Sequence, residues 1–223
     1  MALLCGTDVS PSVPDRLADV PARATPRREQ LFDALVALLL ADGFAHLTLD
    51  DIAARLRCSK RTLYALAGSK EQLVRAAVVH FFRGATERVE RAVRSAERAA
   101  DRVGAYLRAV AVELAPASAT FFDDVAAFPP AAEVYRRNTR IAARRVRELV
   151  DEGVETGEFR DVHAEFVADV VTAVMVRIQQ RRLAEATGLT DGEAYANLAE
   201  LLLHGLAAPG PAAVHGASPH REC

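Results

Sequence analysis

The chain has 223 residues, of which 51% are hydrophobic and 26% are charged, and its formal net charge is −2 at pH 7. This composition is typical of globular proteins and excludes an intrinsically disordered chain or a uniformly basic one. The cysteines Cys5, Cys58 and Cys223 are too far apart for a zinc motif or a disulfide framework. No apolar run approaches the ~20 residues of a membrane span, and no signal-peptide pattern is present. We therefore expect one or two cytoplasmic domains without a metal or another cofactor.

Residues 1–24 contain several prolines among small and polar residues, so they are predicted to form a disordered arm. Pro26 suits the first turn of a helix, and Gly43 suits the position just after its end. Leucines recur at helical spacing between them, which predicts an amphipathic supporting helix.

The segment TLDDIAARLRCSKRTLYALAGSKE, residues 48–71, predicts two short helices separated by a tight turn. Thr48 and Asp51 have the spacing of a capping box, which places the start of the first helix. Ser59 is suited to cap the second helix, so Lys60 and Arg61 occupy its first turn. A helix-turn-helix unit of this kind lays the start of its second helix in the DNA major groove.

The rest of the chain predicts further helices, without strand alternation or a repeat. Ser69 begins a long helix that runs into the nineties, and Asp101 begins another that Pro116 ends. A short apolar helix around 121–128 and a longer one from Pro129 follow. The last two helices carry apolar stripes at Phe166, Val170, Val174 and Ile178, and at Tyr195, Leu198, Leu202 and Leu206. These signals predict an all-α fold of about nine helices, followed by a disordered tail from residue 209.

Positive charge is concentrated around the predicted helix-turn-helix unit. Residues 23–83 have ten Lys or Arg against six Asp or Glu, a balance of +4, and residues 55–62 have four cations and no acid. Such a patch attracts phosphates, although composition alone would favour a solvated surface. For the six arginines within residues 136–147, a solvated helix face is favoured over binding to DNA or an anionic ligand.

The sequence TLDDIAARLRCSKRTLYALAGSKEQL resembles the DNA-binding segment of the tetracycline-repressor (TetR) family of transcription regulators. In that segment the threonine, the I-A pair, the serine, T-L-Y and S-K-E recur in this order. The resemblance is specific over residues 27–75 and covers the remainder only by helix number, helix length and a GVETGEF-like turn. It implies a helix-turn-helix domain over 25–68 and a helical effector-binding and dimerisation domain over 69–208.

By this resemblance, Thr48, Tyr64 and Lys70 are expected to contact phosphates, and the start of the second helix is expected to face the groove. The full set of expected DNA-binding residues is Thr48, Arg57, Ser59, Lys60, Arg61, Thr62, Tyr64 and Lys70. Three positions depart from the family pattern: Arg57 replaces a turn glycine, Ala67 an aromatic residue and Leu66 a polar aromatic residue. Arg57 would be strained if the turn needs a positive φ, although its charge would favour phosphates.

Aromatic residues in the predicted core are candidates for an apolar effector pocket: Phe82, Tyr106, Phe121, Phe122, Phe128 and Tyr135. Helical spacing does not distinguish such a cavity from a filled core, so both alternatives remain open. The apolar stripes of the last two helices predict a dimer interface made by Phe166, Val170, Val174, Ile178, Leu198 and Leu202.

The expected function is transcription regulation by a ligand-responsive repressor that binds a palindromic site on double-stranded DNA as a homodimer. Its effector would be an unknown small molecule. The alternative is a helical small-molecule-binding or interaction protein without specific DNA use. An enzyme is not indicated, because no catalytic or phosphate-loop motif is found. Cys58 is interpreted as a partly buried turn residue rather than a redox sensor, and the pair Asp123 and Asp124 as cap or surface residues.

Overall fold

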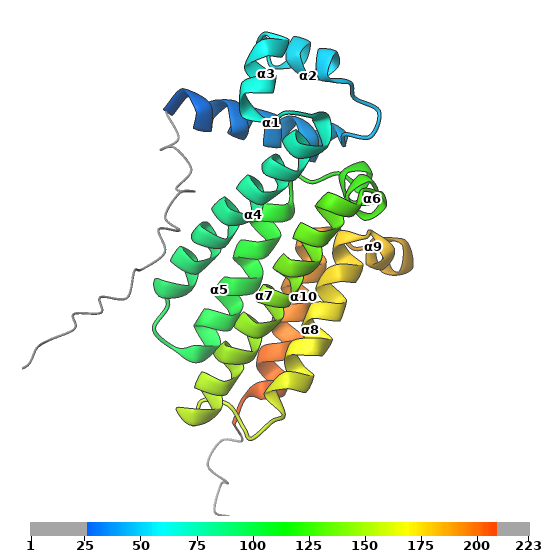
Figure 1. Ribbon diagram of the computed structural model, residues 1–223. Helices are drawn as coiled ribbons and strands as arrows, with labels where there is room; N and C mark the ends of the chain where they lie inside the picture. The colour runs from blue at the N-terminus through cyan, green and yellow to red at the C-terminus, as the bar shows by residue number, and fades with distance from the viewer. Residues whose placement is uncertain (1–25, 209–223) are drawn as a thin grey trace, which may run out of the picture.

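The computed structural model describes residues 26–208, and these residues form helices without a β-sheet (Figure 1). In chain order the helices are α1 (Pro26–Asp42), α2 (Leu49–Arg55), α3 (Lys60–Leu66), α4 (Lys70–Arg94), α5 (Ala99–Leu114), α6 (Ala119–Ala127), α7 (Pro129–Glu155), α8 (Ala164–Gln179), α9 (Arg182–Thr187) and α10 (Asp191–Leu206). The predicted all-α class is confirmed. The predicted arm over 1–24 and tail over 209–223 lie outside the described residues.

The described part of the chain has one helix more than the predicted nine, and the additional helix is α9. Its six residues include no buried side chain, and no side chain caps its start. Arg181 and Gly188 flank it with φ values of 61° and 74°. Because α9 has neither an apolar stripe nor a side-chain cap at its start, the periodicity of the sequence does not predict it.

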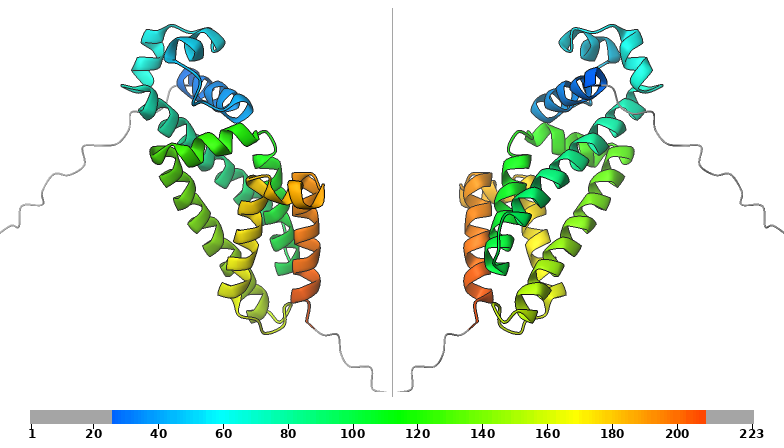
Figure 2. Two further views of the ribbon diagram at one scale, coloured as in Figure 1. Left: turned by 90° about the vertical axis from the view of Figure 1, so that its right-hand side faces the viewer. Right: turned by 90° about the vertical axis from the view of Figure 1, so that its left-hand side faces the viewer.

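Helices α1, α2 and α3 form a head at one end of the molecule (Figures 1 and 2). Helix α4 leaves this head and runs along a bundle that also contains α5, α7, α8 and α10. Helix α6 packs against both α1 and α7, at the junction of head and bundle. Among the helices of residues 26–208, none combines the length and the apolar character needed to cross a membrane.

The apolar interior consists of two clusters that do not follow the predicted domain boundary at residue 69. One cluster joins the three head helices to the first half of α4, to α6 and to the start of α7. The other joins the second half of α4 to α5, α7, α8 and α10. The head therefore shares its core with α6, which lies some fifty residues later in the sequence than the last head helix.

A buried polar chain connects three helices of the bundle. Tyr135 on α7 donates a hydrogen bond to the side-chain oxygen of Gln179 on α8, and the Gln179 amide donates to the Tyr195 hydroxyl on α10 at 3.2 Å. Burial raises the pKa of Tyr135 to about 12. Its hydroxyl therefore stays protonated as a donor at neutral pH, and the buried Gln179 is satisfied on both sides.

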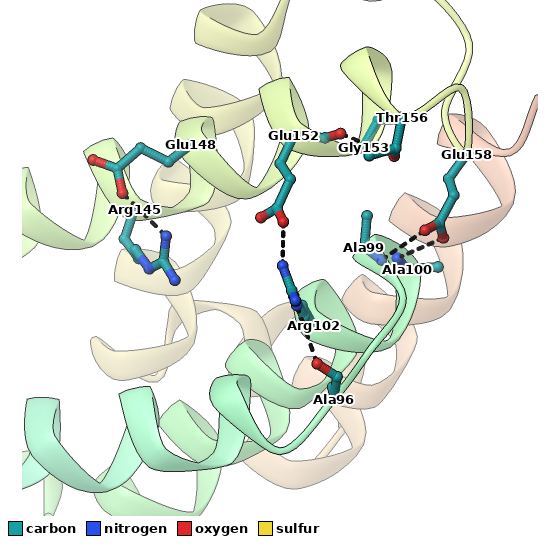
Figure 3. A network of polar contacts seen from close by, with 10 residues as sticks. All are labelled: Ala96, Ala99, Ala100, Arg102, Arg145, Glu148, Glu152, Gly153, Thr156 and Glu158. Carbon is teal, nitrogen blue, oxygen red and sulfur yellow. Dashed lines mark hydrogen bonds and ion pairs between the residues drawn. The ribbon is translucent and has the colours of Figure 1, made fainter.

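At the far end of the bundle, α5 begins at Ala99, two residues before the predicted start (Figure 3). The reason is a cap supplied from elsewhere in the chain, because Arg98 makes no side-chain cap bond. The Glu158 carboxylate, in the loop after α7, accepts from the backbone N–H groups of Ala99 at 3.1 Å and Ala100 at 3.5 Å. These bonds lower the pKa of Glu158. Beside it, Arg102 on α5 pairs with Glu152 on α7.

The turn after α7 needs a glycine at residue 153. A Cβ atom at this position would lie 2.1 Å from Cδ2 of Phe159, whose ring is buried with 4% of its surface exposed. Gly153 therefore allows Phe159 to fold back against the end of α7. This contact also sets the position of Glu158 next to the start of α5.

Replacing Gly153 with alanine is expected to destabilise the protein, because Phe159 must move away from the new methyl group. Overpacking of this kind costs about 1 to 3 kcal/mol, to be measured as the free energy of unfolding in urea. Gly192→Ala is the matched control, since a Cβ there meets nothing within 4 Å in α10. The control should be neutral or stabilised by up to about 1 kcal/mol. Equal stability of the two variants would contradict the packing argument.

Candidate DNA-binding surface and effector cavity

The turn between α2 and α3 places the start of α3 at the surface of the head. Leu56 ends α2, and Arg57 then adopts a left-handed conformation with φ of 50°. The Cys58 N–H donates to the Ala53 carbonyl at 3.0 Å and closes the turn. A non-glycine residue in this conformation costs about 1 to 2 kcal/mol. The family pattern has glycine at this position, and the turn does require a positive φ there. The side chain of Arg57 is exposed.

Capping interactions fix the helices on either side of this turn. Thr48 accepts from the Asp51 N–H at 3.2 Å, and Asp51 accepts from the Thr48 N–H at 2.8 Å, as predicted for a capping box. The Thr48 hydroxyl also donates to the Asp51 carboxylate at 2.7 Å, and this bond, with that from the Thr48 N–H, lowers the pKa of Asp51. Ser59 accepts from the Thr62 N–H at 3.1 Å, and the two hydroxyls are 2.8 Å apart. Thr48, Ser59 and Thr62 therefore have internal hydrogen-bond partners in addition to their predicted place on the DNA-binding surface.

The cations of the first turn of α3 differ in their surroundings. The Lys60 ammonium is 2.8 Å from the Asp50 carboxylate on α2, and this hydrogen bond raises the pKa of Lys60. Arg61 is exposed and has no ion pair with any residue of 26–208. Tyr64, one turn later, is 50% exposed. Arg61 and Tyr64 thus present their polar atoms to solvent, where a phosphate or a base edge would have access.

Lys70 begins α4, and its ammonium donates to the Ala45 carbonyl at 3.0 Å. Ser69 caps the same helix end by accepting from the Gln72 N–H at 3.2 Å. The Gln72 side chain accepts from Gly68 rather than completing the predicted capping box with Ser69. Lys70 is therefore a charge held in one place, at the point where α4 meets the loop between α1 and α2.

Near the tip of the head lie two further cations that were not among the predicted DNA-binding residues. Arg27 and Arg28, in the first turn of α1, line a shallow groove with Arg57, Ser59 and Thr62. The residues lining this groove include no acid. Arg27 and Arg28 contributed only to the local charge balance in the sequence, because nothing local placed the start of α1 beside the turn before α3.

Cys58 lies half-buried in the turn and is a free thiol. Burial raises the pKa of this thiol. A redox-sensing cysteine needs a stabilised thiolate, which nearby cations would provide by lowering the pKa. The direction of the shift at Cys58 is the opposite, which fits the packing role expected for it.

Asp124 on α6 binds the backbone of the loop that precedes α2. Its carboxylate accepts from the N–H groups of Phe44 at 2.5 Å and Ala45 at 2.8 Å. The Ser118 N–H donates to the Leu40 carbonyl at 2.8 Å and adds a second link between α6 and α1. Gly43 allows this approach, because it has φ of 78° and a Cβ there would lie 2.6 Å from the Asp124 carboxylate. This role was not predicted, since Asp124 is distant in the chain from the loop that it binds.

Four helices of the bundle line a cavity of about 80 Å³ that is partly open to solvent. Its lining residues are Phe82, Ala85, Thr86, Val89 and Glu90 from α4, Tyr106, Val110, Glu113 and Leu114 from α5, Asn138, Ile141, Ala142 and Arg145 from α7, and Met175 from α8. Among the six predicted pocket residues, Phe82 and Tyr106 line it. The sequence left open whether these aromatic residues line a cavity or fill a core. Two of them line the cavity, and the others lie in a filled core.

The other predicted pocket residues, Phe121, Phe122, Phe128 and Tyr135, belong to the packed cluster between the cavity and the head. Phe122 and Phe121 stack edge to face with ring centroids 5.4 Å apart, and Phe121 meets Phe44 of the head in the same way at 6.3 Å. The expectation that all six aromatic residues line one cavity is thus corrected. Their rings fill the interior because α6 crosses over this end of α4 and α7, a tertiary feature that helical spacing does not contain.

The predicted dimer-interface residues divide into exposed and buried ones. Phe166 and Val170 on α8 are 67% and 42% exposed, whereas Ile178 is 1% exposed and packs inside the protomer. Val174, Leu198 and Leu202 are partly buried against the same cluster. Leu201 on α10 is 74% exposed and shares a surface groove with Phe166, although the sequence stripe did not include it. The place of Ile178 is corrected, because its side of α8 faces the bundle.

The fold and the two sites together define a class of protein. A capped helix-turn-helix with exposed cations, joined by one long helix to a helical bundle with an internal cavity, is the architecture of a DNA-binding transcription regulator. Residues 31–77 match the family model described as bacterial regulatory proteins, tetR family. The resemblance found in the sequence is confirmed over these residues.

Solved structures of transcription regulators share the fold. A regulator from Cytophaga hutchinsonii aligns with a TM-score of 0.65 and 16% identity, over 82% of this chain and 100% of that chain. A Saccharomonospora viridis protein in complex with choline, described as a transcription regulator, gives 0.70 and 17% over 82% and 98%. The fatty acid degradation regulator of Bacillus halodurans gives 0.66 and 14% over 83% and 98%. No curated protein matches the sequence. The family and these structures belong to regulators rather than enzymes.

Removing the Asp124 carboxylate is expected to free the loop before α2. In Asp124→Ala the Phe44 and Ala45 amides lose a charged acceptor, and hydrogen bonds to charged groups contribute about 1.5 to 3 kcal/mol. Hydrogen exchange followed by NMR should show faster exchange of these two amides, together with a lower free energy of unfolding. The control is Asp123→Ala, which removes the neighbouring exposed carboxylate. Unchanged exchange at Ala45 in Asp124→Ala would show that the contact does not hold the loop.

Proposed function

We propose that the protein is a cytoplasmic, ligand-responsive transcription repressor that binds a palindromic operator as a homodimer. In this proposal residues 25–68 read the DNA, and residues 69–208 bind the effector and the second copy. The observation that carries it is the exposed, cationic start of α3, held at the surface by capped helices and a strained turn. Its Arg61 side chain is free of ion pairs within the described residues.

The proposed DNA contacts fall into two groups. Arg61 and Thr62 face the major groove and contact base edges, with Lys60 and Ser59 beside them. Thr48, Arg57, Tyr64 and Lys70 contact phosphates and fix the position of the head. Arg27 and Arg28 extend the phosphate-binding side of the head, because they line the groove next to Arg57.

We propose that α8 and α10 form the dimer interface. Phe166, Val170 and Leu201 are exposed large apolar side chains on these helices. An apolar surface of this kind on neighbouring helices fits a self-complementary contact around a two-fold axis. Val174, Leu198 and Leu202 would border it, whereas the buried Ile178 would support it from inside. Two heads held in this way would read half-sites about 34 to 36 Å apart.

The cavity is the proposed effector site, and its position suggests how an effector would act on the heads. Phe82 lines the cavity and contacts Tyr135 at a centroid distance of 6.1 Å, and Tyr135 contacts Phe122 at 6.3 Å. From there the packed rings lead through Phe121 to Phe44 beside the Asp124 contact. An effector that binds better to a state with altered head spacing would lower DNA affinity. The S. viridis relative with bound choline supports a small-molecule effector for this fold.

Binding to DNA is tested by selecting bound sequences from a random duplex library, which should enrich a palindrome. Arg61→Ala is expected to relax discrimination at one or two base positions, at a cost of about 1 to 3 kcal/mol. Lys70→Ala should weaken binding to all sequences alike and lower the salt slope by about one. Arg91→Ala, which removes an exposed charge from the far half of α4, is the control. If neither Arg61→Ala nor Lys70→Ala changes the affinity, the assigned contacts are wrong.

Dimerisation is tested by sedimentation at micromolar concentration, where the native chain should be a dimer. Phe166→Asp places a charge in the centre of the proposed interface and should give a monomer that remains folded, since Phe166 is 67% exposed. Val112→Asp changes a similarly exposed apolar residue on α5 and should leave the dimer intact. A native monomer, or equal effects of both substitutions, would rule out this interface.

A further inference from the structure

The charged groups of the cavity are unequal in number. Two carboxylates, Glu90 from α4 and Glu113 from α5, line it, together with one guanidinium, Arg145 from α7. The remaining lining is apolar or neutral. The inner surface therefore has an excess of one negative charge, counting these side chains as ionised.

Arg145 is fully engaged by acids of the protein itself. Its guanidinium donates to Glu90 at 2.9 Å and to Glu148 at 3.1 Å, and it is partly buried between them (Figure 3 shows the Glu148 contact). An anionic ligand would have to displace one of these carboxylates and place its own charge near Glu90 and Glu113. The cavity is therefore poorly suited to an anion.

The second carboxylate, that of Glu113, is paired with an arginine from outside the cavity lining. Arg88 binds Glu113 through two hydrogen bonds of 2.7 and 2.6 Å, yet Arg88 does not line the cavity. Its side chain is 51% exposed, whereas that of Glu113 is 14% exposed. Arg88 is thus the more exposed partner, and its movement into solvent would leave the Glu113 carboxylate to a cation inside the cavity.

Tyr106 provides a neutral polar group in the same wall. It is 5% exposed, lines the cavity, and its hydroxyl has no hydrogen-bond partner among the residues of 26–208. No buried polar side-chain atom of residues 26–208 lacks a hydrogen-bond partner, so this hydroxyl is accessible, and a ligand in the cavity could donate to it. The rings of Phe82 and Tyr106 and the sulfur of Met175 add polarisable surface, and aromatic faces attract cations.

We propose that the effector is a small organic ammonium ion, whose charged nitrogen lies against the Glu113 carboxylate and whose short apolar part contacts Val89, Val110 and Met175. This inference rests on the proposed function, because it names the chemistry of the effector in that site. The cavity volume of about 80 Å³ limits its size. Since one water occupies about 10 to 15 Å³ of such space, a ligand of about five to eight non-hydrogen atoms fits without rearrangement.

The test compares three probes that share one apolar chain: butylammonium, butanol and butyrate. The chain has two methionines, Met1 and Met175, so methyl-labelled methionine gives an NMR signal from inside the cavity. Butylammonium is expected to shift the Met175 methyl resonance saturably at millimolar concentration and constant ionic strength. Butanol and butyrate should bind at least about tenfold more weakly, because butanol has no positive charge to pair with Glu113 and butyrate is repelled by it. Equal or tighter binding of either probe, or no saturable shift with butylammonium, would overturn the proposal.

Substitutions then test the individual groups with the same signal. Glu113→Gln should weaken butylammonium binding roughly tenfold or more, and Tyr106→Phe should weaken it less. Glu87→Gln, which removes an exposed acid next to Arg88, is the matched control and should change little. Arg88→Gln should tighten butylammonium binding, because it removes the cation that competes for Glu113. Unchanged or weaker binding in Arg88→Gln would exclude this exchange.

The titration reads the cavity without DNA, so its result is independent of the DNA selection experiment. A protein that binds butylammonium but enriches no palindrome would retain the ligand class and lose the proposed regulatory function. A protein that enriches a palindrome but prefers butanol or butyrate would retain the regulatory function and lose the ligand class.

Discussion

One carboxylate holds the head of this protein to its bundle. Asp124 accepts two consecutive backbone N–H groups, those of Phe44 and Ala45, in the loop that leads into α2. The carbonyl of the same Ala45 accepts from Lys70 at the start of α4. A single peptide segment is thus bound from α6 on one side and from α4 on the other. The orientation of the helix-turn-helix relative to the bundle depends on these few hydrogen bonds and on the close approach that Gly43 permits.

Around this contact, the helix-turn-helix head packs directly against the bundle. The cluster that contains the interior of α1–α3 also contains Phe81 and Phe82 of α4 and Phe121 and Phe122 of α6. Packed interiors have low compressibility and transmit displacements rather than absorbing them. A change in the volume or shape of the cavity beside Phe82 would therefore be felt at α6. The two functions proposed for the chain meet at Phe82, which lines the cavity and belongs to the cluster of the head.

Local rules predicted the helix-turn-helix well because its determinants lie within a few residues of one another. The caps at Thr48 and Ser59 follow from nearby sequence, whereas the positive φ of Arg57 was suggested only by the glycine of the family pattern. The features that the sequence did not predict depend on tertiary contacts. Asp124 acts on a loop about eighty residues away, and Ile178 faces inward because of how α8 is rotated in the bundle. The separation of cavity from aromatic cluster likewise depends on where α6 crosses α4.

Helix α6 also bears on modularity. Since the core of the first three helices is completed by the first half of α4 and by Phe121, Phe122 and Val125 of α6, these three helices alone would expose apolar surface. During synthesis they cannot finish packing until about residue 131 has left the ribosome. A chimaera that transplants only residues 26–68 onto another bundle would lack the apolar contacts of α6, whereas one that also carries α6 would keep them. The smallest portable unit of the protein is therefore discontinuous in sequence.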